Sequence, residues 1–318
     1  MARVRFTFPK GRCVIKGMRC LLSLALIVAQ PALAADPPSA AKPAPAPTPG
    51  AIVAAAPAGA WRAVPDDDLL IFRLEGDRRV VVQLAPAFDA AHVANIRALA
   101  KAGWWNGKSV YRVQDNYVAQ WGDATEKAAL PPGIAKDLKP VYVSPRAGFA
   151  NTIVPLPYPD AYAPGAGFVD GWPVAMDKAN VWLPHCYGAV GVARDLSPDA
   201  GTGAELYAII GQAPRQLDRN IAVVGRVIEG IALLSSLPRG TGEMGFYRGD
   251  EKPLPIVSAV LASDLPQAER PHFQVMDTAS ESFAAYLRLR ANRRDAFYTV
   301  PAGGVDLCNA PVPVRRAP

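Results

Sequence analysis

The stretch NGKSVYRVQDNYVAQWGD, residues 106–123, holds two short runs of apolar and β-branched residues on either side of a turn. The first run covers residues 108–113 and the second covers residues 117–121. Runs of this length, bounded by Gly, Asn and Asp, are typical of short β-strands. The two predicted strands carry Arg112 and Gln120, the polar side chains on which the functional interpretation depends.

More short strands are expected on both sides of this stretch. Residues 68–74 and 79–84 form a predicted hairpin around Glu75-Gly76-Asp77, and a helix follows that Asp89 caps and Gly103 ends. Many short strands with few helices indicate a mostly β fold, built on a closed or nearly closed antiparallel barrel. The remaining predicted strands cover residues 189–193, 205–210 and 222–227.

Two segments do not follow this pattern of short strands. Residues 124–184 are rich in Pro, Gly and Tyr with little periodicity, which predicts a long insertion wrapped on the barrel. The tail, residues 266–318, contains a predicted helix that begins at a capping box, Thr278 to Glu281. We therefore expect a barrel domain over residues 61–265 and a C-terminal extension with one helix. The apolar residues that share a face of this helix are Phe283, Tyr286, Leu287 and Ala291.

The N-terminal residues have the order of a secretory signal. Six basic residues precede an apolar stretch at residues 21–29, and small residues follow up to Ala34. The apolar stretch has nine residues, whereas a helix that crosses a membrane needs ~20. We expect cleavage near Ala34, export to the periplasm and no stable membrane insertion. Residues 35–60 are almost entirely Ala and Pro, which predicts a disordered linker.

The net charge carries little information about partners. The chain has 34 Lys and Arg against 28 Asp and Glu, and six of the basic residues lie within the first 19 positions. The rest of the chain is therefore balanced, without the basic field that attracts nucleic acid. We expect no nucleic-acid partner.

Two of the four cysteines, Cys13 and Cys20, lie in the predicted signal peptide. The other two, Cys186 and Cys308, can pair as a disulfide in an oxidising compartment. The alternative is a pair of buried thiols, and their spacing does not resemble a CxxC redox or metal motif.

Residues 106–123 resemble the cyclophilins. In that family an aromatic residue or His precedes Arg-Val, and after a short turn come an aromatic, an aliphatic, any residue, Gln and Gly-Gly-Asp. Trp121 stands here in place of the first Gly of that motif. The matching residues are Arg112, Tyr117, Val118, Gln120, Gly122 and Asp123. The resemblance continues, in the family's order, at residues 191–194, 203–209, 217–220 and 223–230.

The resemblance implies a closed eight-stranded barrel capped by helices, and peptidyl-prolyl cis-trans isomerase activity without a cofactor. It gives catalytic roles to Arg112 and Gln120, and it places the main chain of Ala193 and Arg194 along the substrate. The side chains expected to line the proline pocket are Tyr117, Val118, Tyr207, Leu217 and Ile221.

Three departures from the family pattern affect this expectation. Gln216 replaces a common Trp, Ile221 replaces a common His, and Glu205 replaces a Gln. These changes favour altered specificity and reduced turnover. They leave open an alternative, in which the chain is a weakly catalytic module that binds proline peptides or acts as a chaperone of the cell envelope.

Other kinds of site find little support in the sequence. His92, His185 and His272 lack a second His or a carboxylate at metal-ligand spacing, so we expect no metal. The expected partners are polypeptides that contain proline, and we expect a monomer.

Overall fold

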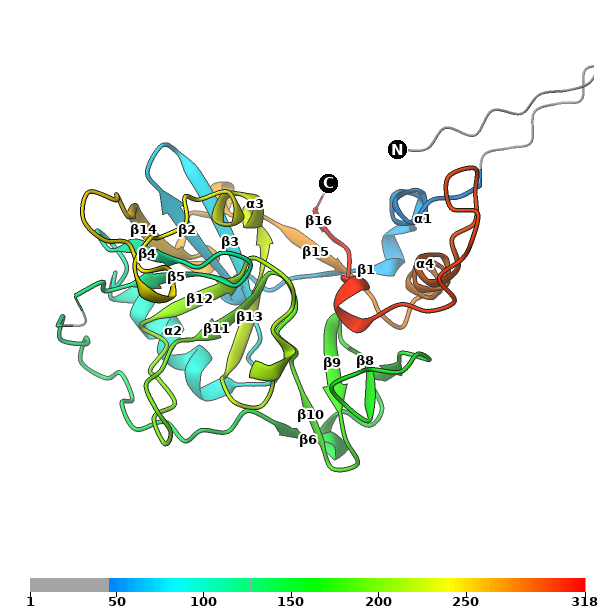
Figure 1. Ribbon diagram of the computed structural model, residues 1–318, viewed down its shortest axis with the longest axis horizontal. Helices are drawn as coiled ribbons and strands as arrows, with labels where there is room; N and C mark the ends of the chain where they lie inside the picture. The colour runs from blue at the N-terminus through cyan, green and yellow to red at the C-terminus, as the bar shows by residue number, and fades with distance from the viewer. Residues whose placement is uncertain (1–45, 126, 318) are drawn as a thin grey trace, which may run out of the picture. The chain divides into compact units, whose positions relative to one another are not determined.

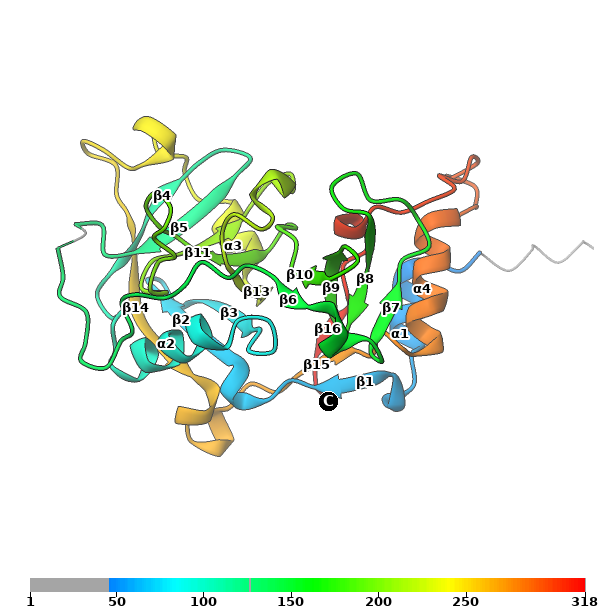
Figure 2. The ribbon, with the colours of Figure 1, turned by 90° about the horizontal axis from the view of Figure 1, so that it is seen from below.

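The computed structural model of the chain describes residues 46–125 and 127–317, shown in Figures 1 and 2. The predicted signal peptide, residues 1–34, and the first part of the predicted linker lie outside the described residues. No helix of the described residues is both long and apolar enough to cross a membrane.

A closed barrel of eight antiparallel strands forms the main part of the described structure (Figure 1). The pairing of β11 with β13 closes the circle. This confirms the expected mostly β fold. In their order around the barrel the strands are β11 (Ala189–Val192), β12 (Leu206–Ile209), β5 (Val118–Gly122), β4 (Ser109–Val113), β14 (Leu254–Leu261), β2 (Leu69–Leu74), β3 (Arg78–Leu84) and β13 (Val223–Glu229).

The one strand of the barrel that the sequence analysis did not assign is β14, which pairs with β2 and β4. Its sequence begins Leu254-Pro255, and a proline weakens the signal of a strand inside a sheet. Its ladder with β2 also shifts register between Ile256 and Ser258. Both features break the regular alternation that identifies a strand from sequence.

Helices pack on the barrel and on the segments that follow it. The predicted first helix is confirmed: the carboxylate of Asp89 accepts a hydrogen bond from the His92 N–H at 3.0 Å, and Val93, Ile96 and Leu99 are buried in the barrel core. The α-helices of the described residues are α1 (Pro49–Ala55), α2 (Ala90–Lys101), α3 (Ile231–Ser235) and α4 (Glu281–Asn292).

The insertion contains a five-stranded antiparallel sheet of its own. Its central hairpin turns at Asp170-Gly171, where both residues have positive φ angles of 47° and 85°. An Asp-Gly pair of this kind is a strong signal of a two-residue hairpin. In order across the sheet its strands are β6 (Ser144–Pro145), β10 (Asn180–Trp182), β9 (Trp172–Met176), β8 (Gly165–Val169) and β7 (Ile153–Pro155).

The C-terminal extension forms a three-stranded sheet with residues from the start of the barrel domain, and its one helix packs on the insertion. β1 (Trp61–Ala63) pairs with β15 (Phe273–Met276), which pairs with β16 (Val314–Arg316). The ring of Phe168 in β8 lies 4.8 Å from that of Phe283 in α4, so this helix packs against the sheet of the insertion (Figure 2).

Two expectations about these segments differ from the structure. Part of the Ala/Pro-rich region is helical, because Thr48 caps α1, Pro49 begins it, and Ile52 packs on the cluster around α4. The cap of α4 is Ser280, whose hydroxyl accepts from the Phe283 N–H at 3.1 Å. Thr278 instead accepts from the Gly171 N–H at 3.3 Å.

A disulfide joins Cys186, which follows the insertion, to Cys308 in the extension. It closes a loop over a sequence separation of 122 residues. A cross-link over so long a loop lowers the entropy of the unfolded chain.

We predict that replacing both Cys186 and Cys308 by Ser lowers the free energy of unfolding by about 5 kcal/mol, as expected for a loop of this length. Urea unfolding with and without a reducing agent measures this. Reduction should destabilise the wild-type protein to the same extent and leave the double variant unchanged. An unchanged wild-type free energy after complete reduction would contradict the prediction.

Candidate active site

Arg112 and Gln120 lie directly opposite each other on the paired strands β4 and β5. Residues in register on neighbouring strands place their side chains on the same face of the sheet. The Arg112 Nη1 donates to the Gln120 Oε1 at 2.9 Å. The structure thus brings together the two predicted catalytic residues, with Gln120 buried and Arg112 half-buried.

Two further acceptors hold the Arg112 guanidinium. Its Nε donates to the main-chain oxygen of Met244 at 2.8 Å, and its Nη2 donates to the Gln114 Oε1 at 2.6 Å. The ring of Phe246 lies 5.3 Å from the guanidinium carbon. These contacts come from different segments, so they fix both the position and the plane of the group.

The charge of Arg112 has no acidic partner among the described residues. All three hydrogen-bond acceptors are neutral amide oxygens. Partial burial lowers the pKa of Arg112 below its ordinary value, although the group stays cationic at neutral pH. The site therefore holds a fixed positive charge that no carboxylate neutralises.

A chain of hydrogen bonds supports Gln120 from the other side. The Gln120 Nε2 donates to the Tyr111 hydroxyl at 2.7 Å, and this hydroxyl donates to the Glu205 Oε2 at 2.8 Å. The Asp123 N–H donates to the Glu205 Oε1 at 2.7 Å. When ionised, Glu205 only accepts, so the Tyr111 hydroxyl donates to it and accepts from the Gln120 Nε2, which leaves the Gln120 Oε1 for Arg112.

The carboxylate of Glu205 lies against the backbone of Gly122. A Cβ atom at this position would stand 1.9 Å from the Glu205 Oε2, so only glycine leaves room for the chain of hydrogen bonds. Burial raises the pKa of Glu205 to about 7, and the hydrogen bonds from Asp123 and Tyr111 only partly oppose this.

Most of the predicted proline pocket forms one apolar cluster. Val118 and Tyr207 are buried in it, and Tyr117, Ala193 and Ile221 pack on it while half-buried. Leu217 ends the short helix η4 (Arg215–Leu217) and is not part of this cluster. Strands of the insertion contribute Trp172, Val174 and Val181 to the same cluster.

A cavity of about 420 Å³ opens beside Gln120. Its wall includes Tyr111, Gln120, Ala193, Arg194 and Glu205. The Ala193 N–H already donates to the main-chain oxygen of Glu205 at 2.9 Å, so it is not free to bind a peptide. Of the main-chain groups expected to bind the substrate here, the Ala193 carbonyl and the main chain of Arg194 remain.

A series of buried polar side chains, linked by hydrogen bonds, ends at Tyr207 in the wall of the predicted pocket. The Tyr207 hydroxyl lies 3.0 Å from the His185 Nε2, and the His185 Nδ1 lies 3.1 Å from the Asp218 Oδ1. The Arg215 Nε donates to the Asp218 Oδ2 at 2.6 Å, and the Arg215 Nη1 donates to the Asp160 Oδ2 at 3.0 Å. This chain links the wall of the pocket to the insertion, which supplies Asp160.

The charges in this buried chain are paired. Burial alone would raise the pKa of Asp218, but the hydrogen bond from His185 and the charge of Arg215 outweigh it and hold the pKa below its ordinary value. A carboxylate accepts only, so the His185 Nδ1 carries a proton and donates to Asp218.

The sequence analysis did not give a role to Gln114, His185 or Asp218. Gln114 lies only two residues after Arg112, at the start of the turn. Its hydrogen bond with Arg112 could therefore have been predicted from the sequence. His185 and Asp218 carried no local signal, because the fold brings together residues 33 positions apart. Among the described residues no group of three His, Cys, Asp or Glu could hold a metal ion.

Comparisons with known proteins identify relatives of this chain. Residues 69–260 match the family model of the cyclophilin-type peptidyl-prolyl cis-trans isomerases. Proteins named "probable peptidyl-prolyl cis-trans isomerase" from Brucella suis and Brucella melitensis are each 24% identical over 201 residues, covering 63% of this chain and 85% of theirs. The crystal structure of a cyclophilin from Hirschia baltica is similar with a TM-score of 0.64 and 26% identity, covering 80% of this chain and 93% of that one.

We predict that Glu205→Gln changes how stability depends on pH. The pKa of Glu205 rises on folding from about 4.5 to about 7, so its contribution is fully present below pH 4.5 and is lost as the pH rises to 7. The wild-type free energy of unfolding should therefore fall across this window relative to the variant, by on the order of 1 kcal/mol per pH unit. Urea unfolding at several pH values measures the difference, and parallel pH profiles would refute the assignment.

We predict that Tyr207→Phe lowers the free energy of unfolding by about 1 to 3 kcal/mol, because it leaves the buried His185 Nε2 without its partner. Tyr187→Phe is the matched control, since the Tyr187 hydroxyl bonds to Ser235 at an exposed position. Its effect should stay within about 0.5 kcal/mol. Equal effects in the two variants would show that the bond to His185 contributes nothing.

Proposed function

The chain belongs to the family of cyclophilin-type peptidyl-prolyl cis-trans isomerases, and we propose on that premise that Arg112 is its catalytic cation, acting on X-Pro bonds of exported polypeptides. One observation carries the assignment. The Arg112 guanidinium is fixed by three neutral acceptors, has no acidic partner among the described residues, and stands beside an apolar cluster.

The reaction requires no bond cleavage. Conjugation between nitrogen and carbonyl gives the peptide bond a rotational barrier of ~18 to 20 kcal/mol, so X-Pro bonds exchange over tens to hundreds of seconds. A catalyst needs only to bind the twisted amide more tightly than either planar form. In the twisted amide the prolyl nitrogen regains its lone pair, which a fixed donor can bind.

The residues divide this task between them. Arg112 donates to the twisted amide, and Gln120 holds the guanidinium in place through its Oε1. Tyr117 and Ile221 form the accessible edge of the apolar cluster, against which the prolyl ring packs. A preorganised donor at a site that excludes water stabilises the transition state without reorganisation during the reaction.

The neighbouring cavity receives the peptide on the other side of Gln120. Its wall includes Gln120 and the Tyr111 hydroxyl group to which Gln120 donates, so it adjoins the position proposed for the proline. Ala193 and Arg194 form another part of its wall. The carboxylate of Glu205 gives this cavity a preference for neutral or basic side chains near and above pH 7.

Two features support action outside the cytoplasm. The N-terminal residues have the order of a secretory signal peptide with cleavage near Ala34. The disulfide between Cys186 and Cys308 suits an oxidising compartment such as the periplasm. The clients proposed here are accordingly exported proteins that contain proline and fold in that compartment.

The second candidate is a weakly catalytic module that binds proline peptides or acts as a chaperone. The burial of Val118 and Tyr207 under the insertion favours it, because a ring can contact only the edge of the cluster. The fixed and unneutralised charge of Arg112 favours catalysis, since binding alone does not need it. Turnover and peptide binding, measured on the same variants, separate the two.

We predict that Arg112→Ala lowers kcat/KM for isomerisation of a short Ala-Pro peptide by about 100-fold or more, the effect of removing one preorganised donor. Arg112→Lys should recover only part of the activity, because an ammonium cannot reach three acceptors in one plane. Arg73→Ala, an exposed arginine on β2, is the control and should keep wild-type activity.

Thermal unfolding of each variant excludes loss of structure as the cause. Wild-type and Arg112→Ala proteins with equal rates near background, and with unchanged peptide binding, would contradict the catalytic role and support the binding module.

A further inference from the structure

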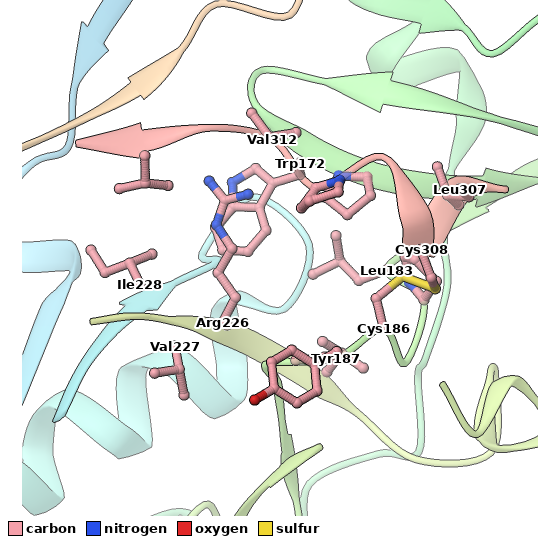
Figure 3. A pocket seen from close by; sticks show the side chains of 17 residues that line it. Trp172, Leu183, Cys186, Tyr187, Arg226, Val227, Ile228, Leu307, Cys308 and Val312 are labelled. Carbon is pink, nitrogen blue, oxygen red and sulfur yellow. A yellow bond between two sulfur atoms is a disulfide. The ribbon is translucent and has the colours of Figure 1, made fainter. Parts of the chain in front are cut away.

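A second cavity, of about 320 Å³, lies away from the catalytic pair and shares none of its residues. It is bounded by β13, by the end of the insertion and by the C-terminal extension, as Figure 3 shows. Its volume is at the lower end of the range for small-molecule sites. Most of its wall is apolar, and its larger aliphatic side chains include Leu183, Val223, Val227, Ile228, Leu307 and Val312.

The exception in this wall is Arg226. Its side chain rises from β13, and its guanidinium carbon lies 4.4 Å from the centre of the Trp172 ring (Figure 3). The Nε and Nη2 donate to the Gln83 Oε1 at 3.0 and 2.8 Å, and the Nη1 donates to the main-chain oxygen of Gly171 at 2.8 Å. These three hydrogen bonds leave two of the five N–H groups of a guanidinium.

No carboxylate of the described residues pairs with Arg226. By contrast, Arg79 on the neighbouring strand β3 lies 2.7 Å from the Glu229 carboxylate. Burial lowers the pKa of Arg226 to about 9, and no opposing acidic charge raises it. The group is still cationic at neutral pH, so the wall of an apolar cavity holds a positive charge without a counter-ion.

Such a charge is costly to desolvate unless an anion compensates it. Arg226 is the sole Lys or Arg among the residues that line the cavity, which suits one negative charge and not a phosphate dianion. The aliphatic wall suits an apolar body attached to that charge. A guanidinium also matches the planar geometry of a carboxylate.

We propose that this cavity binds a small amphipathic monocarboxylate, with its carboxylate on Arg226 and its apolar body against the side chains of the insertion and the extension. The disulfide between Cys186 and Cys308 forms part of the wall and ties these two segments together (Figure 3). The site thus lies between β13 of the barrel and the additions to the barrel, and its ligand stabilises their packing on β13.

Isothermal titration calorimetry of the full chain with octanoate, and with octanol as the uncharged probe, tests the proposal. Octanoate should bind the wild-type protein more tightly than octanol does. Arg226→Gln should weaken octanoate binding by about 10-fold or more, as expected for hydrogen bonds to a charged group, and should leave octanol binding unchanged. Arg79→Gln is the matched control and should bind octanoate as the wild type does.

Arg226→Gln also removes the hydrogen bonds to Gln83 and Gly171, so a second variant is needed that keeps them. Ile228→Trp fills the cavity while leaving Arg226 in place, and it should abolish binding of both probes. Arg112→Ala should bind octanoate normally, because the catalytic pair is not part of this site. Thermal unfolding of every variant shows that it is folded.

Three results would overturn the proposal. The first is the absence of octanoate binding to the folded wild-type protein. The second is equal affinity of octanoate for the wild type and for folded Arg226→Gln. The third is stronger competition by an acetylated tripeptide acid ending in Phe, which would assign the cavity to polypeptide C-termini instead of small free acids.

Discussion

The fixed position of the Arg112 guanidinium is the constraint on which the active site depends. Three neutral oxygens hold it, so its charge stays available to a substrate instead of being consumed in an ion pair. The pairing of β4 with β5 sets Gln120 opposite it, and the bonds through Tyr111 to Glu205 fix Gln120 in turn. Arg112 is therefore held on one side by Gln114 and Met244, and on the other by a chain of hydrogen bonds that ends at Glu205.

The barrel could be predicted from sequence because its strands follow local rules. The hairpin of β2 and β3, the capped helix α2 and the pair β4 and β5 each have an apolar pattern bounded by turn residues, and the structure confirms them. β14 lacked that regularity because of Pro255 and its shifted register. The sheet of the insertion had one clear local signal, the Asp170-Gly171 turn, within a segment whose composition otherwise suggests loops.

The site was predictable only in part, and for a physical reason. Arg112 and Gln120 belong to one hairpin, so spacing along the chain is enough to bring them together. The chain from Tyr207 through His185 and Asp218 to Arg215 and Asp160 depends on how the insertion packs on the barrel, which no local pattern encodes. The same packing buries Tyr207 and leaves only the edge of the apolar cluster accessible, so the insertion shapes the proposed proline pocket.

The most direct test of this account is a crystal structure of the mature protein with a short peptide that contains Ala-Pro. The account places the prolyl ring against Tyr117 and Ile221, with the Arg112 guanidinium within hydrogen-bond distance of the X-Pro amide and still bonded to Gln120. A peptide bound with its proline elsewhere, or an Arg112 side chain that leaves Gln120 and turns to solvent when the peptide binds, would contradict it.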